Sequence, residues 1–224
     1  MKIKKLVSLF LSLVLVVSLC ACGKVSTGEN EDSQPPAENQ NEVTTPDNNP
    51  ADDEAAKKDI VVTDMKGRTV TIPADADRFV CIGPGCLRLY CYVADESQLA
   101  GVEEVEVSWG DDGRTYRMAM ENLDDYAIVG PGGPGNAPDA EMLFAAEADV
   151  IFSCYGMETA EIDELQDKIM TPIVALSYGK ASLFSEEVNE SLRLIGTITG
   201  NTERAEALIQ YFEDAKTDLQ TRSA

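Results

Sequence analysis

The stretch "FVCIGPGCLRLYC", residues 79–91, joins an apolar run to a helical pattern through a turn that is almost entirely backbone, Gly83-Pro84-Gly85. The run from Arg78 to Ile82 predicts a short buried strand, and the apolar residues after the turn predict a helix from Cys86 to Ala94. The turn returns in a longer form as "AIVGPGGPGNAP", residues 127–138. Neither copy carries a side chain with obvious catalytic chemistry.

Strand and helix patterns alternate along the rest of the chain. The sequence "IVVTDMKGRTVTIP" alternates and breaks at Lys66-Gly67, which predicts a hairpin from Ile60 to Ile72 that stops at Pro73. A polar stretch from Trp109 to Asn122 separates two of the expected strands. The order of segments predicts a parallel α/β sheet with covering helices. The expected strands are 99–103, 126–130, 149–155 and 172–178, and the expected helices are 140–146, 160–169 and 184–198.

The last segment predicts one long amphipathic helix. Asn201 or Thr202 can cap its N-terminus, and the acidic Glu203 lies in its first turn. Apolar residues recur at spacings of three and four, so the helix should carry a single apolar stripe. We expect the middle of this stripe to be exposed and open to proteolysis unless a partner covers it. The stripe consists of Ala205, Leu208, Ile209, Phe212, Ala215 and Leu219.

The N-terminal segment has the pattern of a secretory signal. Three lysines precede an apolar run from Leu6 to Leu19, which is too short to span a bilayer comfortably. The run ends in Leu19-Cys20-Ala21-Cys22, which resembles a bacterial lipobox, although Cys20 is an unusual occupant. By that resemblance residues 1–21 are a signal peptide and Cys22 is the lipidated first residue of the mature protein. The alternative is a membrane-anchoring helix that is never cut, and either anchor places the rest of the chain outside the cytoplasm.

The next segment, residues 22–58, is rich in Asn, Glu, Asp, Pro and Thr and has almost no large apolar side chains. Such a composition cannot bury enough apolar surface to offset its ordering entropy, which predicts a disordered acidic tether. The formal net charge of -22 at pH 7 disfavours nucleic acid and anionic lipid headgroups as partners.

The 224 residues include no histidine. This absence excludes Ser-His-Asp and Cys-His catalysis, His-rich zinc or manganese capture and axial histidine ligation of haem. The segment expected to fold contains Cys81, Cys86, Cys91 and Cys154. These cysteines could form disulfides outside the cell. Their apolar neighbours and the lack of a C-x-x-C pair instead favour free, buried thiols.

The two glycine turns invite a binding role. Each follows an apolar strand, and open α/β sheets bind ligands at the carboxyl edge of their strands. Glycine lets backbone N–H groups approach a ligand, so the turns are candidate cradles for an anion; the alternative is that they only make tight strand-to-helix turns. The turns do not match nucleotide-binding motifs. A dinucleotide-binding G-x-G-x-x-G would need a glycine at Arg88, and a P-loop starting at Gly130 would need a lysine at Asn136.

At this point the sequence resembles a known family. The turn "GPG" after a strand, the hairpin "TDMKGRTVTIP", a later "AEADVIF" and the helix start "TERAEAL" look like substrate-binding lipoproteins of ABC importers in the iron-siderophore, haem and cobalamin group. The resemblance implies two α/β lobes joined by one long helix, with the ligand in the cleft between them. Residues 59–200 would be the N-terminal lobe, a parallel-sheet lobe, and residues 201–224 the linker helix. The second lobe is missing, so the chain is expected to be truncated.

Carried over residue by residue, the resemblance implies a ligand site in the loops after the strands. Arg114 and Arg117 would donate charge-assisted hydrogen bonds to a carboxylate-rich or phosphate-like ligand, or they are ordinary surface residues. The only tryptophan would stack on a flat chelate or anchor its loop. Tyr155 and Tyr178 are the best direct iron ligands available. The family, however, mostly binds iron that is already coordinated by a chelator, so no metal site or cofactor is expected. The implied ligand-binding residues are Gly83, Pro84, Gly85, Cys86, Trp109, Arg114, Arg117, Gly132, Gly133, Gly135, Tyr155 and Tyr178.

The resemblance also implies a partner and a function. Glu141 matches the acidic residue that meets arginines on the ABC permease, and the alternative is an ordinary solvated carboxylate. The implied function is a solute-binding component, lipid-anchored to the bacterial cell membrane, that captures an iron chelate or a related anionic metal complex without catalysis. Two alternatives stay open. One is a secreted metal-dependent hydrolase that uses Asp111 and Asp112, and the other is a truncated surface lipoprotein that binds no ligand.

Overall fold

A computed structural model describes residues 58–120, 122–179 and 184–223. The predicted signal peptide, the lipidation site Cys22 and all but the last residue of the predicted tether lie outside these residues. The predicted hairpin is confirmed: strands β1 (Ile60–Thr63) and β2 (Thr69–Ile72) pair antiparallel, with Ile60 opposite Ile72.

The predicted parallel sheet is also confirmed. Strands β3 (Phe79–Ile82), β4 (Leu99–Gly101), β5 (Val150–Ser153) and β6 (Ile173–Ala175) form a four-stranded sheet in the order β4-β3-β5-β6. All pairs are parallel. Every residue of β3, β5 and β6 is buried. Strands of this kind appear in the sequence as continuous apolar runs because helices cover both of their faces.

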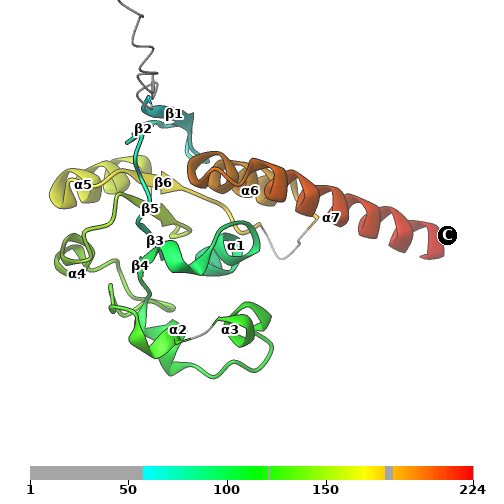
Figure 1. Cartoon of the computed structure of the whole chain (residues 1–224), viewed down its shortest axis with the longest axis horizontal. Helices are drawn as coiled ribbons and strands as arrows, with labels where there is room; N and C mark the ends of the chain where they lie inside the picture. Colours follow the sequence, from blue (N-terminus) through cyan, green and yellow to red (C-terminus); the bar gives the residue numbers. More distant parts are fainter. Residues whose placement is uncertain (1–57, 121, 180–183, 224) are drawn as a thin grey trace, which may run out of the picture. The chain divides into compact units, whose positions relative to one another are not determined.

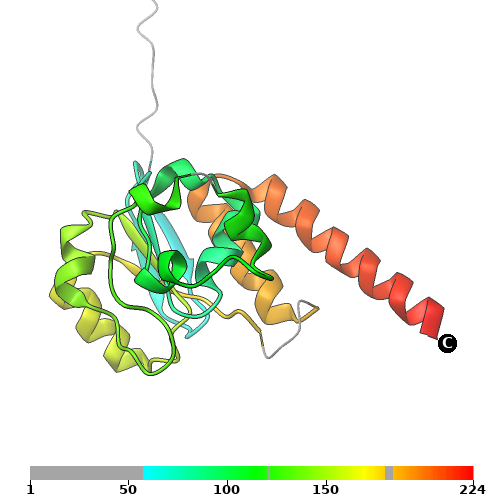
Figure 2. The same cartoon turned by 90° about the horizontal axis from the view of Figure 1, so that it is seen from below.

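Two sets of helices cover the sheet. The face with Phe79 and Phe152 packs against α1 (Cys86–Val93), α6 (Glu186–Thr199) and α7 (Thr202–Ser223). The opposite face, with Val80 and Ile151, packs against α4 (Ala140–Ala145) and α5 (Thr159–Ile169). Alternate strand residues point to opposite faces, which is why neighbours in β3 enter different cores. Figures 1 and 2 show the sheet between these two sets of helices.

One predicted strand is wrong. Residues 126–130 form only a single parallel bridge, between Val102 and Ile128. The chain leaves the sheet after Val102 and enters the short helix α2 (Glu104–Ser108), where the Glu104 amide donates to the carbonyl of Gly130. The ladder therefore has no partner with which to continue. The polar stretch also holds the short helix α3 (Thr115–Ala119), and single turns of 3-10 helix, η1 (Glu96–Gln98) and η2 (Leu123–Asp125), flank this region.

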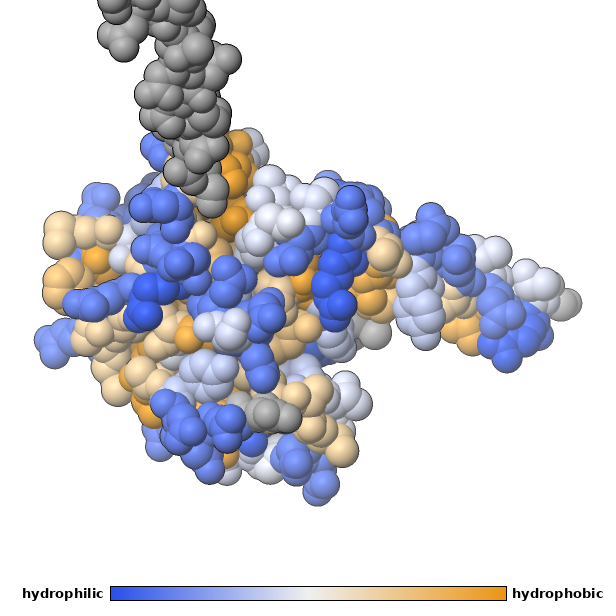
Figure 3. Space-filling model, in the orientation of Figure 1, coloured by the Kyte–Doolittle hydropathy of each residue, from blue (hydrophilic) through white to orange (hydrophobic). Residues whose placement is uncertain are grey.

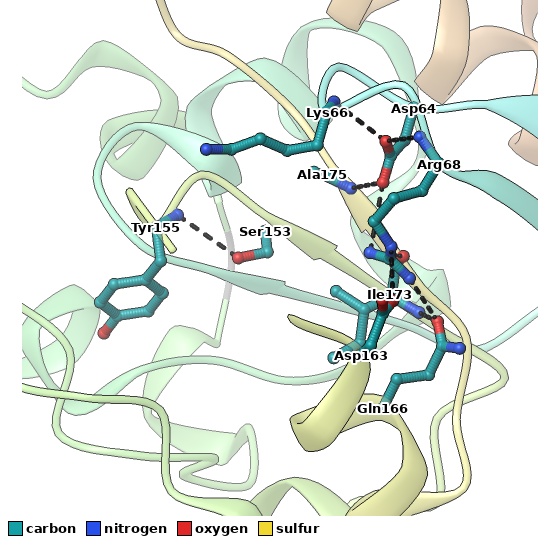
Figure 4. Close-up of polar contacts among 9 residues, drawn as sticks. All are labelled: Asp64, Lys66, Arg68, Ser153, Tyr155, Asp163, Gln166, Ile173 and Ala175. Atoms are coloured by element: carbon teal, nitrogen blue, oxygen red, sulfur yellow. Dashed lines mark hydrogen bonds and ion pairs between the residues drawn. The ribbon is translucent and has the colours of Figure 1, made fainter. Parts of the chain in front are cut away.

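A buried ionic network fixes the hairpin to the sheet (Figure 4). Asp64 is 5% exposed, and its carboxylate accepts hydrogen bonds from the amides of Lys66 and Arg68 at 2.9 Å and of Ala175 at 3.2 Å. The Arg68 guanidinium pairs with this carboxylate, donates to Gln166 at 2.9 Å and pairs with Asp163 at 2.9 Å. The hairpin turn is thus joined to β6 and α5.

The expected exposure of the stripe on the last helix is wrong. Ile209 is 6% exposed and Phe212 is 7% exposed, because α6 and α1 cover them, and Leu208 is partly buried in the same cluster. Helices α6 and α7 cross closely at Gly196 of α6, where a Cβ would lie 2.8 Å from the Cβ of Ala205 in α7. Residues 213–223 continue as helix with mostly exposed side chains, and Figures 1 and 2 both show this part leaving the lobe.

The surface of the lobe is mixed in polarity. Figure 3 shows hydrophobic side chains scattered among hydrophilic ones over the region of α4 and α5. Met142, Phe144 and Met170 are among the large apolar residues exposed to solvent. Within the described residues, no helix combines the length and the hydropathy that crossing a bilayer requires.

Candidate functional site

The two glycine turns meet in one pocket at the carboxyl edge of the sheet. The pocket has a volume of about 290 Å³ and includes Pro84 and Gly85 from the first turn and Gly133 and Pro134 from the second. Trp109, which is 51% exposed, lies at its edge. We call this the glycine pocket. Its position agrees with the general rule that open α/β sheets bind ligands at the carboxyl ends of their strands.

Gly83 is required at the floor of this region for steric reasons. Its φ is +85°, and a Cβ at this position would lie 2.6 Å from the amide nitrogen of Tyr155 and 2.9 Å from the carbonyl carbon of Cys154. The turn after β3 therefore packs directly on the backbone that follows β5. No side chain fits between them, and the left-handed backbone conformation also favours glycine.

A buried carboxylate already occupies the space between the two turns. Glu103 is 4% exposed, and its carboxylate accepts the Gly83 amide at 3.0 Å and the Tyr155 hydroxyl at 2.7 Å. A Cβ on Gly132 would lie 2.8 Å from the Cβ of Glu103, so the second turn closes over it. The predicted anion cradle is therefore wrong at Gly83, whose amide is bound to an internal anion. Burial raises the pKa of Glu103 above its ordinary value.

A second acidic residue balances the arginine of the pocket. Glu106 is 6% exposed and forms an ion pair with Arg114. The Tyr116 hydroxyl donates to Glu106 at 2.9 Å and accepts from the Arg114 guanidinium at 2.8 Å, and burial with the adjacent carboxylate raises the pKa of Tyr116 to about 12. The positive charge of Arg114 is therefore largely compensated within the lobe.

The structure brings together half of the predicted ligand-binding residues. Those that line the glycine pocket are Gly83, Pro84, Gly85, Trp109, Arg114 and Gly133. Of the others, Gly132 is buried behind Glu103. Gly135, Arg117, Tyr155 and Tyr178 do not line this pocket, and Tyr178 lines a neighbouring one.

Cys86 is wrongly predicted as a ligand contact. Its side chain is fully buried, and its thiol donates to the carbonyl of Phe152 at 3.3 Å. As the first residue of α1 it points into the core instead of the pocket. Its amide is also taken, because it donates to the Gly83 carbonyl at 3.3 Å.

The tyrosines do not form an iron site in this arrangement. The Tyr155 hydroxyl donates to Glu103, and burial together with this carboxylate raises the pKa of Tyr155 well above its ordinary value. A phenol held in its protonated form is a poor ligand for ferric iron. Tyr178 is 41% exposed and lines a pocket that does not include Tyr155.

The prediction of free thiols is confirmed for the four cysteines that the structure describes. Cys81, Cys86 and Cys154 are buried and Cys91 is half-buried, and none of them is in a disulfide. Burial raises the pKa of the Cys81, Cys86 and Cys91 thiols, to about 12 for Cys91, and the hydrogen bond with Cys86, together with burial, raises the pKa of Cys154. Among the described residues, no group of three histidine, cysteine or acidic side chains is arranged to hold a metal ion.

The remaining predicted residues lie on the surface. Glu141 is exposed in the first turn of α4, whose N-terminus is capped by the Asp139 carboxylate. Asp111 and Asp112, which the hydrolase alternative requires, are exposed and do not line the glycine pocket. Asp111 and Asp112 are therefore not part of the same site as the residues that line the glycine pocket.

Sequence reasoning missed Glu103, Glu106 and Tyr116, which supply most of the polar chemistry of the pocket. A signal was present. Glu103 lies two residues after β4, at the same sheet edge as the first glycine turn, and Glu106 falls one helical turn later. Acidic residues at the carboxyl end of a buried strand were therefore candidates for the same site.

Comparison with known proteins identifies the fold. No protein-family model and no curated protein matches the sequence. A periplasmic solute-binding protein from Veillonella parvula has a TM-score of 0.60 at 20% identity, over 73% of this chain and 48% of that one. The petrobactin-binding protein YclQ from Bacillus subtilis has a TM-score of 0.58 at 19% identity, over 74% and 53%. The molybdate-binding protein MolA from Haemophilus influenzae has a TM-score of 0.55 at 21% identity, over 68% and 50%.

The chain spans about half the length of these solved structures. At this level of identity the similarity establishes the fold and not the ligand. The resemblance inferred from the sequence is confirmed at that level: the chain has the α/β fold of periplasmic solute-binding proteins over about half of their length.

Proposed function

We propose that the protein is the solute-binding component of an ABC importer and that the glycine pocket contributes to the capture of an iron chelate or a related anionic metal complex. The observation that carries the proposal is the meeting of both glycine turns, with Trp109 and Arg114, in one pocket at the carboxyl edge of the sheet. The fold supports it, since it is shared with proteins that bind petrobactin and molybdate. A binding protein of this kind performs no catalysis.

The proposal includes a location and a partner. Lipidation at Cys22 would hold the protein at the outer face of the bacterial cell membrane, with residues 22–58 as a tether. The ABC permease would contact the exposed surface of α4 through Glu141. The neighbouring exposed side chains of Met142 and Phe144 would add apolar area to that contact.

Trp109 provides a direct test, because it is the only tryptophan and lies at the edge of the pocket. The chain should be titrated with ferric citrate, a ferric complex of 2,3-dihydroxybenzoate, haem and sodium molybdate. We expect a saturable change in tryptophan emission with at least one of the four. Trp109→Phe should lose this optical signal, which assigns the change in emission to the pocket.

A matched control separates the pocket from the rest of the lobe. Phe144→Trp in the Trp109→Phe background moves the fluorophore to an exposed position on α4 that does not line the pocket, and it should give no ligand-dependent signal. If none of the four compounds binds the wild-type chain by calorimetry, the proposed function is overturned.

A further inference from the structure

A second pocket lies beside the glycine pocket, on the other side of the first turn. It has a volume of about 380 Å³ and is lined by Arg88, Tyr92 and Tyr178. Both pockets include Pro84, Gly85, Arg114 and Tyr116 in their linings, so they are adjoining hollows around the same turn. We call the second one the arginine pocket.

Arg88 differs from Arg114 in its electrostatic environment. Arg114 is paired with Glu106, whereas none of the ion pairs within the described residues includes Arg88. The Nε atom of Arg88 is buried and has no hydrogen-bond partner. A buried donor on a charged group is costly to leave unpaired, and such groups in proteins are almost always satisfied. Within the part of the chain that the structure describes, the Arg88 guanidinium therefore has no carboxylate partner and its Nε has no acceptor.

The backbone of the first turn leaves room for this cation. Gly85 has a φ of +72°, and a Cβ there would lie 3.3 Å from the Cβ of Tyr178 and 3.6 Å from Nη2 of Arg88. The end of the Arg88 side chain thus lies against the glycine, beside Tyr178. Buried neighbours in α1, Leu87 and Leu89, hold the helix that carries it.

The other groups of the arginine pocket match the same kind of ligand. Beside Arg88 the polar lining consists of three tyrosines, the Thr115 hydroxyl and the compensated Arg114, and no carboxylate lines the pocket within the described part of the chain. Guanidinium and hydroxyl groups are donors that suit anionic oxygen atoms. The carboxylates of this region, Glu103 and Glu106, face the glycine pocket instead. The two hollows therefore differ in charge.

We infer that the arginine pocket is a subsite for an anionic, oxygen-bearing group of the ligand and that Arg88 is its specificity-determining residue. This inference rests on the proposed function and names the ligand class for it. The anionic oxygens come either from a free oxyanion or from the carboxylate or phenolate groups of a metal chelate. Both sources present the same chemistry to a guanidinium.

Calorimetric titration of the four compounds into the wild type, Arg88→Gln, Arg88→Lys and Arg222→Gln tests the inference. Arg222 is an exposed arginine near the end of α7, so its variant makes the same change in charge away from both pockets. We expect Arg88→Gln to weaken binding about ten- to a hundredfold, since hydrogen bonds to charged groups contribute that much. Arg88→Lys should lose less, and Arg222→Gln should bind as the wild type does.

The outcomes separate the two proposals. Binding of molybdate alone identifies a free oxyanion, and binding of a ferric complex alone identifies a chelate. Wild-type binding that Arg88→Gln leaves unchanged overturns the subsite and leaves the proposed function standing, whereas no binding to the wild type overturns both. If Arg88→Gln does not fold, Arg88→Lys decides, because an affinity equal to that of the wild type contradicts a subsite that depends on the guanidinium group.

Discussion

Replacing Gly83 by alanine tests the packing that positions the glycine pocket. The added Cβ would lie 2.6 Å from the Tyr155 amide nitrogen, well inside the 3.4–4 Å of ordinary van der Waals contact. The obstacle is backbone and cannot rotate away. Inserting a methyl group into such a site costs about 1–3 kcal/mol, and the positive φ of Gly83 adds about 1–2 kcal/mol for any residue with a Cβ.

Gly135→Ala is the matched control. Gly135 has nearly the same backbone conformation, with a φ of +80°, but a Cβ there would meet nothing within 4 Å. Both variants carry the conformational cost, and only Gly83→Ala carries the collision. We therefore expect Gly83→Ala to unfold with a free energy lower than that of Gly135→Ala by about 1–3 kcal/mol.

Urea denaturation followed by far-ultraviolet circular dichroism measures this difference directly. In a thermal melt the same difference corresponds to a Tm lower by about 2–12 °C, since 1 kcal/mol shifts the Tm of a domain of this size by about 2–4 °C. Equal losses of stability in the two variants would refute the steric argument and would leave Gly83 as an ordinary turn residue.

Three further predictions follow from buried groups. Asp64→Ala should lower the free energy of unfolding by about 3–5 kcal/mol, because three backbone amides lose their buried acceptor and Arg68 keeps only Asp163 as an ion-pair partner. Asp218→Ala, which breaks the exposed pair with Arg222, should cost about 0–1 kcal/mol, and similar values for both variants in urea melts would contradict the network. The pKa of Glu103 is raised in the folded protein above its unfolded value of about 4.3. Its contribution to stability is therefore complete below the unfolded pKa and is lost as the pH rises through the folded pKa. The wild type should thus lose stability relative to Glu103→Gln between pH 4 and 7. A constant difference across that range would show that Glu103 is not perturbed. Iodoacetamide labelling with peptide mapping should leave the buried thiols of Cys81, Cys86 and Cys154 unmodified until the protein unfolds, and rapid labelling of any of them in the folded protein would contradict their burial.

The architecture was predictable where a local pattern was sufficient. The hairpin has an alternating sequence on both sides of a Lys-Gly turn, and the apolar runs of β3 and β5 are long enough to be read as buried strands. Residues 126–130 are also mostly apolar but form only a single bridge. Whether an apolar run becomes a strand depends on a partner strand elsewhere in the chain. Here Val102 is the only described residue that pairs with this run, through its bridge to Ile128.

The site was less predictable because its chemistry depends on contacts between loops. The sequence shows that glycine turns follow strands, but it does not show that Glu103 from the next strand reaches the Gly83 amide. Similarly, the direction of the Cys86 side chain depends on the rotation of α1 against the sheet. The apolar stripe of α7 was recognised, but its cover, α6, lies just before it in the chain and packs back on it.

The contacts of Glu103 have a consequence for the rate of ligand association. One carboxylate links the segments that follow β3 and β5 through the Gly83 amide and the Tyr155 hydroxyl. These segments are consequently restrained from moving independently, and an arriving molecule meets a surface whose shape is set in advance. Encounter should then proceed in one kinetic phase whose rate rises linearly with concentration, without a slow step for rearranging the loops.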